Sequence, residues 1–470
     1  MLMVREAARE IGATASGADA RFDRVSTDTR TLLPNDLYIA LRGPNFDGHQ
    51  FVRAAFDLGA AAALVESGFV FNRADAPLIH AADTRLALGA LAAAWRSRFA
   101  LPLTAVTGSN GKTTVKEMLA AILREVCRAA GVAHGAESSV LASEGNFNND
   151  IGVPLTLLRL RQYHRYAVIE MGMNHAGEIS YLTRMARPAV ALVNNVQRAH
   201  LGMLGSIEAV AHAKGEIFEG LGAAGTAIIN ADDPSAPLLR QLAGKRPRLE
   251  FGTGNGAAVR ATYKLEVGSS VMGLVTPIGN VSVLLQVPGM HNVRNALAAS
   301  AAAIAIGADA LAIAAGLESF SGVQGRLQRK AGQNGAILLD DTYNANPDSV
   351  AAAIQVLAST RGTKILVLGD LGEIGAEGPR LHAQIGASAK AARIDYLFTL
   401  GELSASAARE FGNDAWHFTQ LNELVAAIAP LLRKDVTVLV KGSRFMRMEK
   451  VIAALQAQPG AAKRELNDAA

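Results

Sequence analysis

One stretch near residue 110 constrains the fold more than any other. Residues 107–114 read TGSNGKTT. The apolar run LTAVTG (103–108) leads into it, and the amphipathic segment VKEMLAAILREV (115–126) follows it. A buried strand, a glycine-rich turn and a helix in this order place backbone N–H groups and a helix N-terminus around an anion. The stretch therefore predicts an α/β domain that binds a nucleotide phosphate.

The loop departs from the usual phosphate-binding pattern. G-x-x-x-x-G-K-[ST] requires a glycine five positions before Gly111, where this chain has Val106. Only G-x-x-G-K-T, from Gly108, is present. Lys112 can still reach the β- and γ-phosphates, and the Thr113 hydroxyl can ligate Mg²⁺. The alternative is a glycine-rich turn with a chance lysine, but the flanking strand and helix favour a nucleotide site.

Length and apolar pattern predict three domains. At 470 residues the chain is too long for one core. We expect a small N-terminal α/β domain over 1–98, a central domain with a parallel sheet and the phosphate loop over 99–316, and a doubly wound, Rossmann-like domain over 317–470.

Alternating strands and helices support this α/β assignment. In the central domain the strand candidates are YAVIEMG (166–172), AVALVNNV (189–196) and GTAIINADD (225–233). Residues 262–287 alternate with period two and predict an antiparallel addition. The third domain has four apolar runs that end in Gly or Asp, and ligands of such sheets bind at the carboxyl ends of the strands. These runs are GAILLDDTY, TKILVLGD, DYLFTLG and VTVLVKG.

Composition excludes several classes of protein. The 46 basic and 42 acidic residues nearly balance, and only 5% of residues are aromatic, which argues against a nucleic-acid role. Cys127 is the only cysteine, which favours a reducing cytoplasm. The charged start is unlike a signal peptide. The small-residue stretch 296–317 is long enough to span a membrane, but Gly307-Ala308-Asp309 predicts a break between two buried helices.

Three further residues are candidates for the nucleotide site. Glu170 ends a predicted strand beside the loop and is a natural oxygen ligand for Mg²⁺. His200 follows another strand end, where a histidine alone would more often be structural. Lys214 lies in a predicted helix, where a lysine is usually solvated. Near a metal it could instead react with CO₂ to give a carbamate, although spacing alone does not indicate this.

Several motifs together resemble the Mur ligases, the ATP-dependent amide ligases of bacterial peptidoglycan precursor synthesis. They are TGSNGKTT, IEMGMNHAGEIS, NNVQRAHLG and AKGEIF. EGNFNNDIGVPLTLL (144–158), DDTYNANPDSVAAAI (340–354) and LVKGSRFMRMEKVI (439–452) resemble the family member that adds a dipeptide. The motifs cover nearly the whole chain in the family's order, and the short phosphate loop is the family's form.

The resemblance implies a reaction and its substrates. The γ-phosphate of ATP would move to the carboxylate of a UDP-N-acetylmuramoyl tripeptide, and the amine of D-Ala-D-Ala would attack the resulting acyl phosphate. It implies a cytoplasmic ligase of cell wall synthesis that needs ATP and two Mg²⁺ ions. We expect a monomer, no nucleic acid partner and no membrane span. We further expect the free enzyme to be open and its ligands to close it.

The resemblance also implies roles for individual residues. Thr113 and Glu170 would hold one Mg²⁺, and His200 with a carbamylated Lys214 would serve the second. The catalytic set would be Lys112, His200, Lys214, Asn148 and Asn149. The nucleotide would contact Gly108, Ser109, Asn110, Gly111, Lys112, Thr113, Thr114, Asn292, Asn295, Arg326 and Asp341. Ser26, Asp28, Arg30, Asp47 and His49 would bind the uridine diphosphate end, and Tyr343, Asn344, Asn346, Lys441, Ser443 and Arg444 would face the dipeptide.

Other functions remain open at this point. A sibling ligase that adds the third amino acid, or a folylpolyglutamate synthase, would share the central domain. A regulatory NTPase of the same loop class would bind partners rather than join molecules, and it would need neither outer domain. The sequence does not distinguish diaminopimelate from lysine as the third residue of the tripeptide.

Overall fold

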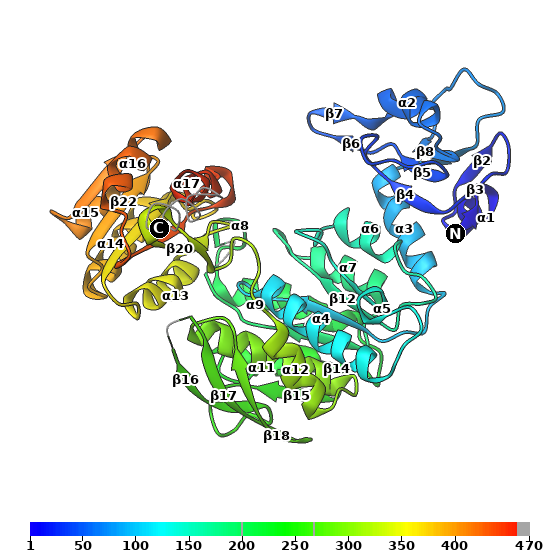
Figure 1. Cartoon of the computed structure of the whole chain (residues 1–470). Coiled ribbons are helices and arrows are strands. Elements are labelled where there is room, and N and C mark those ends of the chain that lie inside the picture. Colours follow the sequence, from blue (N-terminus) through cyan, green and yellow to red (C-terminus); the bar gives the residue numbers. More distant parts are fainter. Residues whose placement is uncertain (199–200, 267, 458–470) are drawn as a thin grey trace, which may run out of the picture.

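The computed structural model describes residues 1–198, 201–266 and 268–457, with the backbone alone at 201 and 202. Figure 1 shows three units that follow one another along the chain, coloured blue, cyan to green, and yellow to red. Each unit is built on its own sheet with helices packed on it. This confirms the predicted three-domain α/β organisation.

The N-terminal unit has a five-stranded sheet in the order β2-β9-β8-β5-β4. The strands are β2 (Thr14–Ser16), β4 (Arg24–Ser26), β5 (Asp36–Ile39), β8 (Ala62–Glu66) and β9 (Leu78–Ala81). All pairings are parallel except that of β2 with β9. The other elements are the pairs β1 (Leu2–Met3) with β3 (Arg21–Phe22) and β6 (Arg42–Gly43) with β7 (Phe46–Asp47), then α1 (Val4–Glu10), η1 (Gly48–Phe51), α2 (Val52–Asp57) and α3 (Thr84–Arg96).

Helix α3 joins this unit to the middle one. It packs against α6 (Gly152–Leu157) and α7 (Glu178–Ala186) of the middle unit. The buried Trp95 donates its indole N–H to the carbonyl of Leu160 at 3.1 Å, and the buried Arg96 donates to the carbonyl of Ala186 at 3.0 Å. One apolar core therefore runs continuously from the N-terminal unit into the middle one.

The middle unit has a six-stranded sheet in the order β11-β12-β10-β13-β14-β15, and every pairing in it is parallel. The strands are β10 (Leu103–Thr107), β11 (Val140–Ala142), β12 (Tyr166–Glu170), β13 (Val190–Val193), β14 (Thr226–Asn230) and β15 (Arg248–Phe251). Strand β10 lies between β12 and β13, so the residues that follow these three strands meet at one edge of the sheet.

Helices cover both faces of this sheet, because successive side chains of a strand point to opposite faces. Ala191 and Val193 of β13 join the core that continues into the N-terminal unit, whereas Val190 and Leu192 join a second core. The helices not yet named are α4 (Lys112–Ala129), α5 (Ala136–Ser139), α8 (Leu201–Leu204), α9 (Ile207–Gly215), η2 (Glu216–Gly220), α10 (Ala236–Ala243), α11 (Met290–Ala305) and α12 (Ala310–Ser319).

The alanine-rich stretch forms two helices, as predicted. Helix α11 ends at Ala305, and Asp309 caps α12 by accepting a hydrogen bond from the N–H of Ala312 at 2.8 Å. Both helices pack on α4. No helix in the described part of the chain is long and apolar enough to cross a membrane.

The predicted antiparallel addition is also present in the middle unit. Strands β16 (Arg260–Leu265), β17 (Ser270–Thr276) and β18 (Gly279–Leu285) form a separate sheet, and both of its pairings are antiparallel. It lies at the bottom of the view in Figure 1, below α11 and α12.

The C-terminal unit is doubly wound around a six-stranded sheet in the order β19-β20-β24-β21-β22-β23. Its strands are β19 (Gln328–Ala331), β20 (Ile337–Asp341), β21 (Thr363–Gly369), β22 (Tyr396–Leu400), β23 (Ala415–Phe418) and β24 (Val436–Lys441). Only the edge strand β19 is antiparallel to its neighbour. The helices are η3 (Gln333–Gly335), α13 (Pro347–Ala358), η4 (Gly375–Glu377), α14 (Gly378–Ala391), α15 (Ala405–Phe411), α16 (Leu421–Ile428), η5 (Ala429–Leu431), η6 (Arg444–Met446) and α17 (Glu449–Leu455).

Candidate active site

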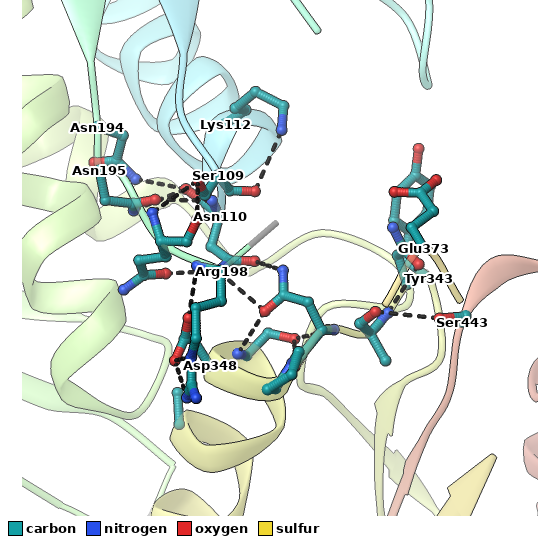
Figure 2. A pocket seen from close by; sticks show the side chains of 18 of the residues that line it. Ser109, Asn110, Lys112, Asn194, Asn195, Arg198, Tyr343, Asp348, Glu373 and Ser443 are labelled. Carbon is teal, nitrogen blue, oxygen red and sulfur yellow. Dashed lines mark hydrogen bonds and ion pairs between the residues drawn. The ribbon is translucent and has the colours of Figure 1, made fainter. Parts of the chain in front are cut away.

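A cleft of about 1420 Å³ separates the middle and C-terminal units. Its walls come from the carboxyl ends of strands in both sheets, where the segments after β10, β12 and β13 face those after β20, β21 and β24. Figure 2 shows side chains of both units pointing into this space. The cleft therefore lies where doubly wound sheets bind their ligands.

The phosphate loop forms one end of the cleft. Gly111 is the N-cap of α4 and has a left-handed φ of 78°, and a Cβ there would lie 2.3 Å from the Oδ1 of Asn295. Only glycine fits this position. Helix α4 is 18 residues long, so its N-terminus presents unpaired N–H groups and a positive dipole end to the cleft.

Lys112 forms no direct ion pair with any residue that the structure describes. Its Nζ donates to the carbonyl of Gly108, at 2.9 Å within its own loop (Figure 2). Burial lowers the pKa of the Lys112 ammonium, and the nearby Glu170 carboxylate partly opposes this shift. A half-buried cation that forms no ion pair with the described residues, beside a helix N-terminus, fits the phosphates of a nucleotide.

Glu170 is held in place from two sides. It is buried at the end of β12, where one carboxylate oxygen accepts from the hydroxyl of Thr113 and the other from the amide of Asn148, both at 2.8 Å. A carboxylate and a hydroxyl in contact offer the oxygen donors that Mg²⁺ prefers, so the predicted Thr113 and Glu170 pair fits a magnesium ion.

Asn149 is turned toward its own backbone rather than toward Glu170. Its Oδ1 accepts from the N–H of Gly152, the first residue of α6, at 2.9 Å. Asn148 and Asn149 both line the cleft. Of the two, Asn148 contacts the candidate metal ligand directly.

Lys214 is buried in α9 and lies outside the lining of the cleft. Burial lowers the pKa of this lysine well below its ordinary value, and the charge of Lys112 adds to the shift. A lysine in this state favours the neutral amine, which is the form that reacts with CO₂. Burial therefore favours the uncharged amine of Lys214 over its ammonium form.

The other half of the predicted second metal site, His200, lies outside the described residues. In the described part of the chain, no three side chains of His, Cys, Asp or Glu are grouped as a metal site would require. The structure therefore leaves the pairing of His200 with Lys214 as a prediction.

Asparagines line the wall next to the phosphate loop. Asn194, directly after β13, donates both to the carbonyl of Asn110 and to the Oδ1 of Asn295, each at 2.9 Å. Asn295 in turn donates to the Oδ1 of Asn292 at 3.3 Å. The predicted pair Asn292 and Asn295 thus lies on one face of α11, buried against the loop and open to the cleft.

Arg326 links the C-terminal unit to the phosphate loop. Its guanidinium donates to the hydroxyl of Thr113 at 2.8 Å and lies 4.3 Å from the ring centroid of Tyr343. Tyr343 follows β20, and Figure 2 shows it on the side of the cleft opposite Lys112. Two predicted residues from different domains, Arg326 and Thr113, are therefore in contact.

The remaining predicted residues of the C-terminal unit gather at the ends of β20 and β24. Lys441 donates to the carboxylate of Asp341 at 2.6 Å and to the carbonyl of Asn344 at 3.0 Å. Ser443 donates to the carbonyl of Ala345 at 3.1 Å. The residues that line the cleft here are Asp341, Tyr343, Asn344, Asn346, Lys441, Ser443 and Arg444.

The predicted residues of the N-terminal unit form a separate group outside this cleft. Both ring nitrogens of His49 are engaged, since Nδ1 lies 2.6 Å from the Oδ1 of Asp47 and Nε2 accepts from the N–H of Glu66 at 2.9 Å. The N–H and ring of His49 hold the pKa of Asp47 at about 2. His49 therefore orders the turn that presents Asp47.

A second turn in this unit is built in the same way. Asp28 accepts from the N–H of Arg30 at 2.9 Å and pairs with its guanidinium. Ser26 donates to the carbonyl of Asp28 at 3.0 Å. The three predicted residues are thus neighbours, and the Arg30 side chain, although paired with Asp28, is 87% exposed.

Comparison with known proteins shows which family the chain belongs to. Three family models match successive parts of the chain: "Mur ligase family, catalytic domain" at 21–96, "Mur ligase middle domain" at 106–303 and "Mur ligase, glutamate ligase domain" at 325–444. The UDP-N-acetylmuramoyl-tripeptide–D-alanyl-D-alanine ligase of Escherichia coli (strain K12) is 44% identical over 94% of this chain and 95% of its own length. The chain belongs to the Mur ligase family.

Solved structures of Mur ligases agree with this assignment. MurF from Acinetobacter baumannii has a TM-score of 0.86 at 35% identity, covering 96% of this chain and 97% of its own. MurF from Thermotoga maritima in complex with ADP has a TM-score of 0.80 at 26% identity, covering 93% and 97%. The three-domain architecture is therefore shared over nearly the whole length.

The sequence analysis did not identify four residues that line the cleft. Asn194 could have been found, because two asparagines directly after an apolar strand place amides at the binding edge. His291 also lines the cleft, and burial lowers its pKa to about 4. Arg198 and Asp348 contact each other across the cleft. No sequence signal joins residues that far apart in the chain.

Proposed function

We infer that this Mur ligase joins D-Ala-D-Ala to a UDP-N-acetylmuramoyl tripeptide at the expense of ATP, in peptidoglycan precursor synthesis. The named relatives, similar over almost their full length, support this function. The observation that best supports phosphoryl transfer in this cleft is the contact of Arg326 with Thr113, because it brings a cation of the C-terminal domain to the phosphate loop.

The reaction solves a chemical problem. A carboxylate is a poor electrophile toward an amine, because its charge repels the nucleophile and oxide is a poor leaving group. In the proposed first step a carboxylate oxygen bonds to the γ-phosphorus of ATP, and the bond from that phosphorus to ADP breaks. The amine of D-Ala-D-Ala then attacks the acyl carbon, loses a proton and expels phosphate. Catalysis is mostly positioning and charge neutralisation.

In this proposal ATP binds to the wall of the cleft that carries the phosphate loop. Lys112 and the loop N–H groups hold the β- and γ-phosphates, while Asn292 and Asn295 hold the adenine. Arg326 and Asp341 approach the phosphates and ribose from the C-terminal domain. Thr113 and Glu170 would hold Mg²⁺, which would supply charge neutralisation for the transferring phosphoryl group. Asn148 orients Glu170 through the hydrogen bond described above.

The second ion of the proposal depends on a carbamylated Lys214 with His200. The neutral amine of Lys214 would bond to the carbon of CO₂ and lose a proton, leaving an anionic oxygen ligand. We expect Lys214→Ala to lower the ligation rate about 10- to 100-fold, as loss of a metal ligand or its support does. Added short carboxylic acids should partly restore the rate, with the same acids added to wild type as the control. Wild-type activity of the variant without added acid would contradict the carbamate.

The outer domains hold the other two substrates in this proposal. The domain over 1–98 binds the uridine diphosphate end through Ser26, Asp28, Arg30, Asp47 and His49, which the exposed Arg30 supports. The domain over 317–470 binds the dipeptide through Tyr343, Asn344, Asn346, Lys441, Ser443 and Arg444. The central domain, 99–316, binds ATP. We propose that the enzyme acts in the cytoplasm as a monomer.

The test is product formation. Purified protein receives ATP, Mg²⁺, D-Ala-D-Ala and either the diaminopimelate or the lysine form of the UDP-N-acetylmuramoyl tripeptide, and the UDP-pentapeptide is sought by mass. Phosphate release should require both the tripeptide and the dipeptide. Slow release without either of them would instead indicate a regulatory NTPase, and product from a different amine would indicate a sibling ligase.

A further inference from the structure

An ion pair outside the proposed chemistry joins the middle and C-terminal domains. Asp348, in the first turn of α13, accepts from the Nε and the terminal nitrogen of Arg198, at 3.1 and 2.6 Å. Its other oxygen accepts from the main-chain N–H of Arg198 at 2.9 Å. The carboxylate therefore holds both the side chain and the backbone of Arg198, a geometry more specific than that of a simple surface pair.

The segment that carries Arg198 is itself bonded to the phosphate loop. The N–H of Gln197 donates to the hydroxyl of Ser109 at 2.9 Å, and the amide of Asn110 donates to the Oε1 of Gln197 at 2.6 Å. The N–H of Asn110 donates to the Oδ1 of Asn195 at 2.8 Å. Any displacement of Arg198 is therefore transmitted to loop residues that face the nucleotide phosphates.

The same helix end touches the loop at a second point. Asn346, the N-cap of α13, donates its amide to the Oδ1 of Asn110 at 2.8 Å, and the amide of Asn110 lies 3.3 Å from the Oδ1 of Asn346. Figure 2 shows Ser109, Asn110, Arg198 and Asp348 in one continuous group of hydrogen bonds between the two domains. The first turn of α13 thus contacts the loop directly and through Arg198.

We propose that Arg198 and Asp348 are positioning residues for the ligation, and that their pairing fixes the phosphate loop in its working geometry only when the C-terminal domain is docked. This inference rests on the proposed ligase function. The pairing makes the geometry of the phosphate loop depend on closure of the C-terminal domain. ATP can therefore bind to the open enzyme but is aligned for transfer only in the closed one.

The competing explanation is local. In that explanation Asp348 only stabilises its own helix, as an acidic residue in the first turn. Its ion pair with Arg198 then adds little to stability, as is common for partly exposed ion pairs. Arg198→Met distinguishes the two accounts, because it leaves α13 and its first-turn charge untouched. A helix-end role therefore predicts no effect of Arg198→Met.

The experiment compares Arg198→Met, Asp348→Ala and the double variant with wild type. We expect Arg198→Met to lower kcat about fivefold and Asp348→Ala about tenfold, because the second also removes the bond to the main-chain N–H of Arg198. The double variant should match Asp348→Ala, because the two side chains act as one unit. The Kd for a non-hydrolysable ATP analogue alone should change less than about twofold. Small-angle scattering with the analogue and the UDP-tripeptide should show compaction of wild type that the variants lose.

Controls make each outcome decisive. Arg433→Met and Asp435→Asn break an exposed ion pair in the same domain, 2.8 Å long, and should leave kcat at the wild-type value. Wild-type kcat in Arg198→Met, or reductions that multiply in the double variant, would overturn the proposal. If Asp348→Ala does not fold, Asp348→Asn replaces it. If wild type makes no pentapeptide, the proposed function fails, and the scattering and binding measurements still judge the domain contact.

Discussion

At the scale of single residues, three lysines in or near the cleft have different surroundings. Lys116 is fully buried, yet it pairs with Glu117 at 2.8 Å and donates to the carbonyl of Ser143. Lys112 and Lys214 form no ion pair with any residue that the structure describes, and the pKa of each is lowered by burial. Lys116 therefore has its partners within the fold, whereas Lys112 and Lys214 lack an ion-pair partner there, which is why we propose functional roles for them.

A histidine gives a pH prediction at the same scale. His164 is buried, and its Nδ1 accepts from the N–H of Arg161 at 2.9 Å, which requires an unprotonated Nδ1. Burial lowers its pKa from 6.5 to about 4. Its contribution to the free energy of unfolding is therefore complete above about pH 6.5 and is lost as the pH falls toward 4, because the unfolded chain binds the proton first.

We expect wild type to lose about 2 kcal/mol of stability from this group between pH 7 and pH 5. The comparison is urea unfolding of wild type and His164→Asn at both pH values. The asparagine keeps an acceptor but cannot titrate, so the variant should depend less on pH. An equal pH dependence of the two proteins would rule out His164 as the cause.

At the scale of elements, the strand, loop and helix around Gly111 could be predicted closely from sequence. The apolar run at 103–108 and the amphipathic segment at 115–126 predicted β10 and α4 to within a few residues. The polar residues that follow the predicted strands indicated which edge of the sheet binds the ligand. The short edge strand β11 and the turn between β4 and β5 were not found, because a few residues at a sheet edge carry little periodicity.

The loop geometry makes an element-scale prediction. Gly111→Ala forces a left-handed φ on alanine and places its Cβ against Asn295 and Asn194, at 2.3 and 2.6 Å. We expect the Kd for an ATP analogue to rise at least about tenfold, since the loop must shift to relieve the contact. Gly131→Ala is the matched control, because Gly131 also has a left-handed φ, 59°, but nothing lies within 4 Å of its Cβ.

Gly131→Ala should lower stability by about 1 kcal/mol and leave the Kd unchanged. Isothermal titration of both variants measures the Kd, and thermal unfolding measures the stability. Equal Kd values for the two variants would mean that crowding at Gly111 does not matter to the nucleotide site.

At the scale of the whole molecule, function depends on contacts that no local pattern reveals. The three domains and the order of their motifs could be predicted, because each domain carries its own strand and helix periods. The family resemblance placed Arg326 and Thr113 at the same nucleotide, but it did not predict their direct contact. The pairing of Arg198 with Asp348 could not be predicted, since it depends on how two separately folded sheets dock. His200, which the resemblance places at the second metal, lies outside the described residues.

The central claim is that the loop lysine and its partners direct the terminal phosphoryl group of ATP to a carboxylate and not to water. The decisive measurement uses UDP-N-acetylmuramoyl tripeptide labelled with heavy oxygen in its terminal carboxylate. After ligation to D-Ala-D-Ala in unlabelled water, the account predicts that the released inorganic phosphate carries an oxygen from the peptide. Phosphate that holds no peptide oxygen while the pentapeptide forms would contradict it.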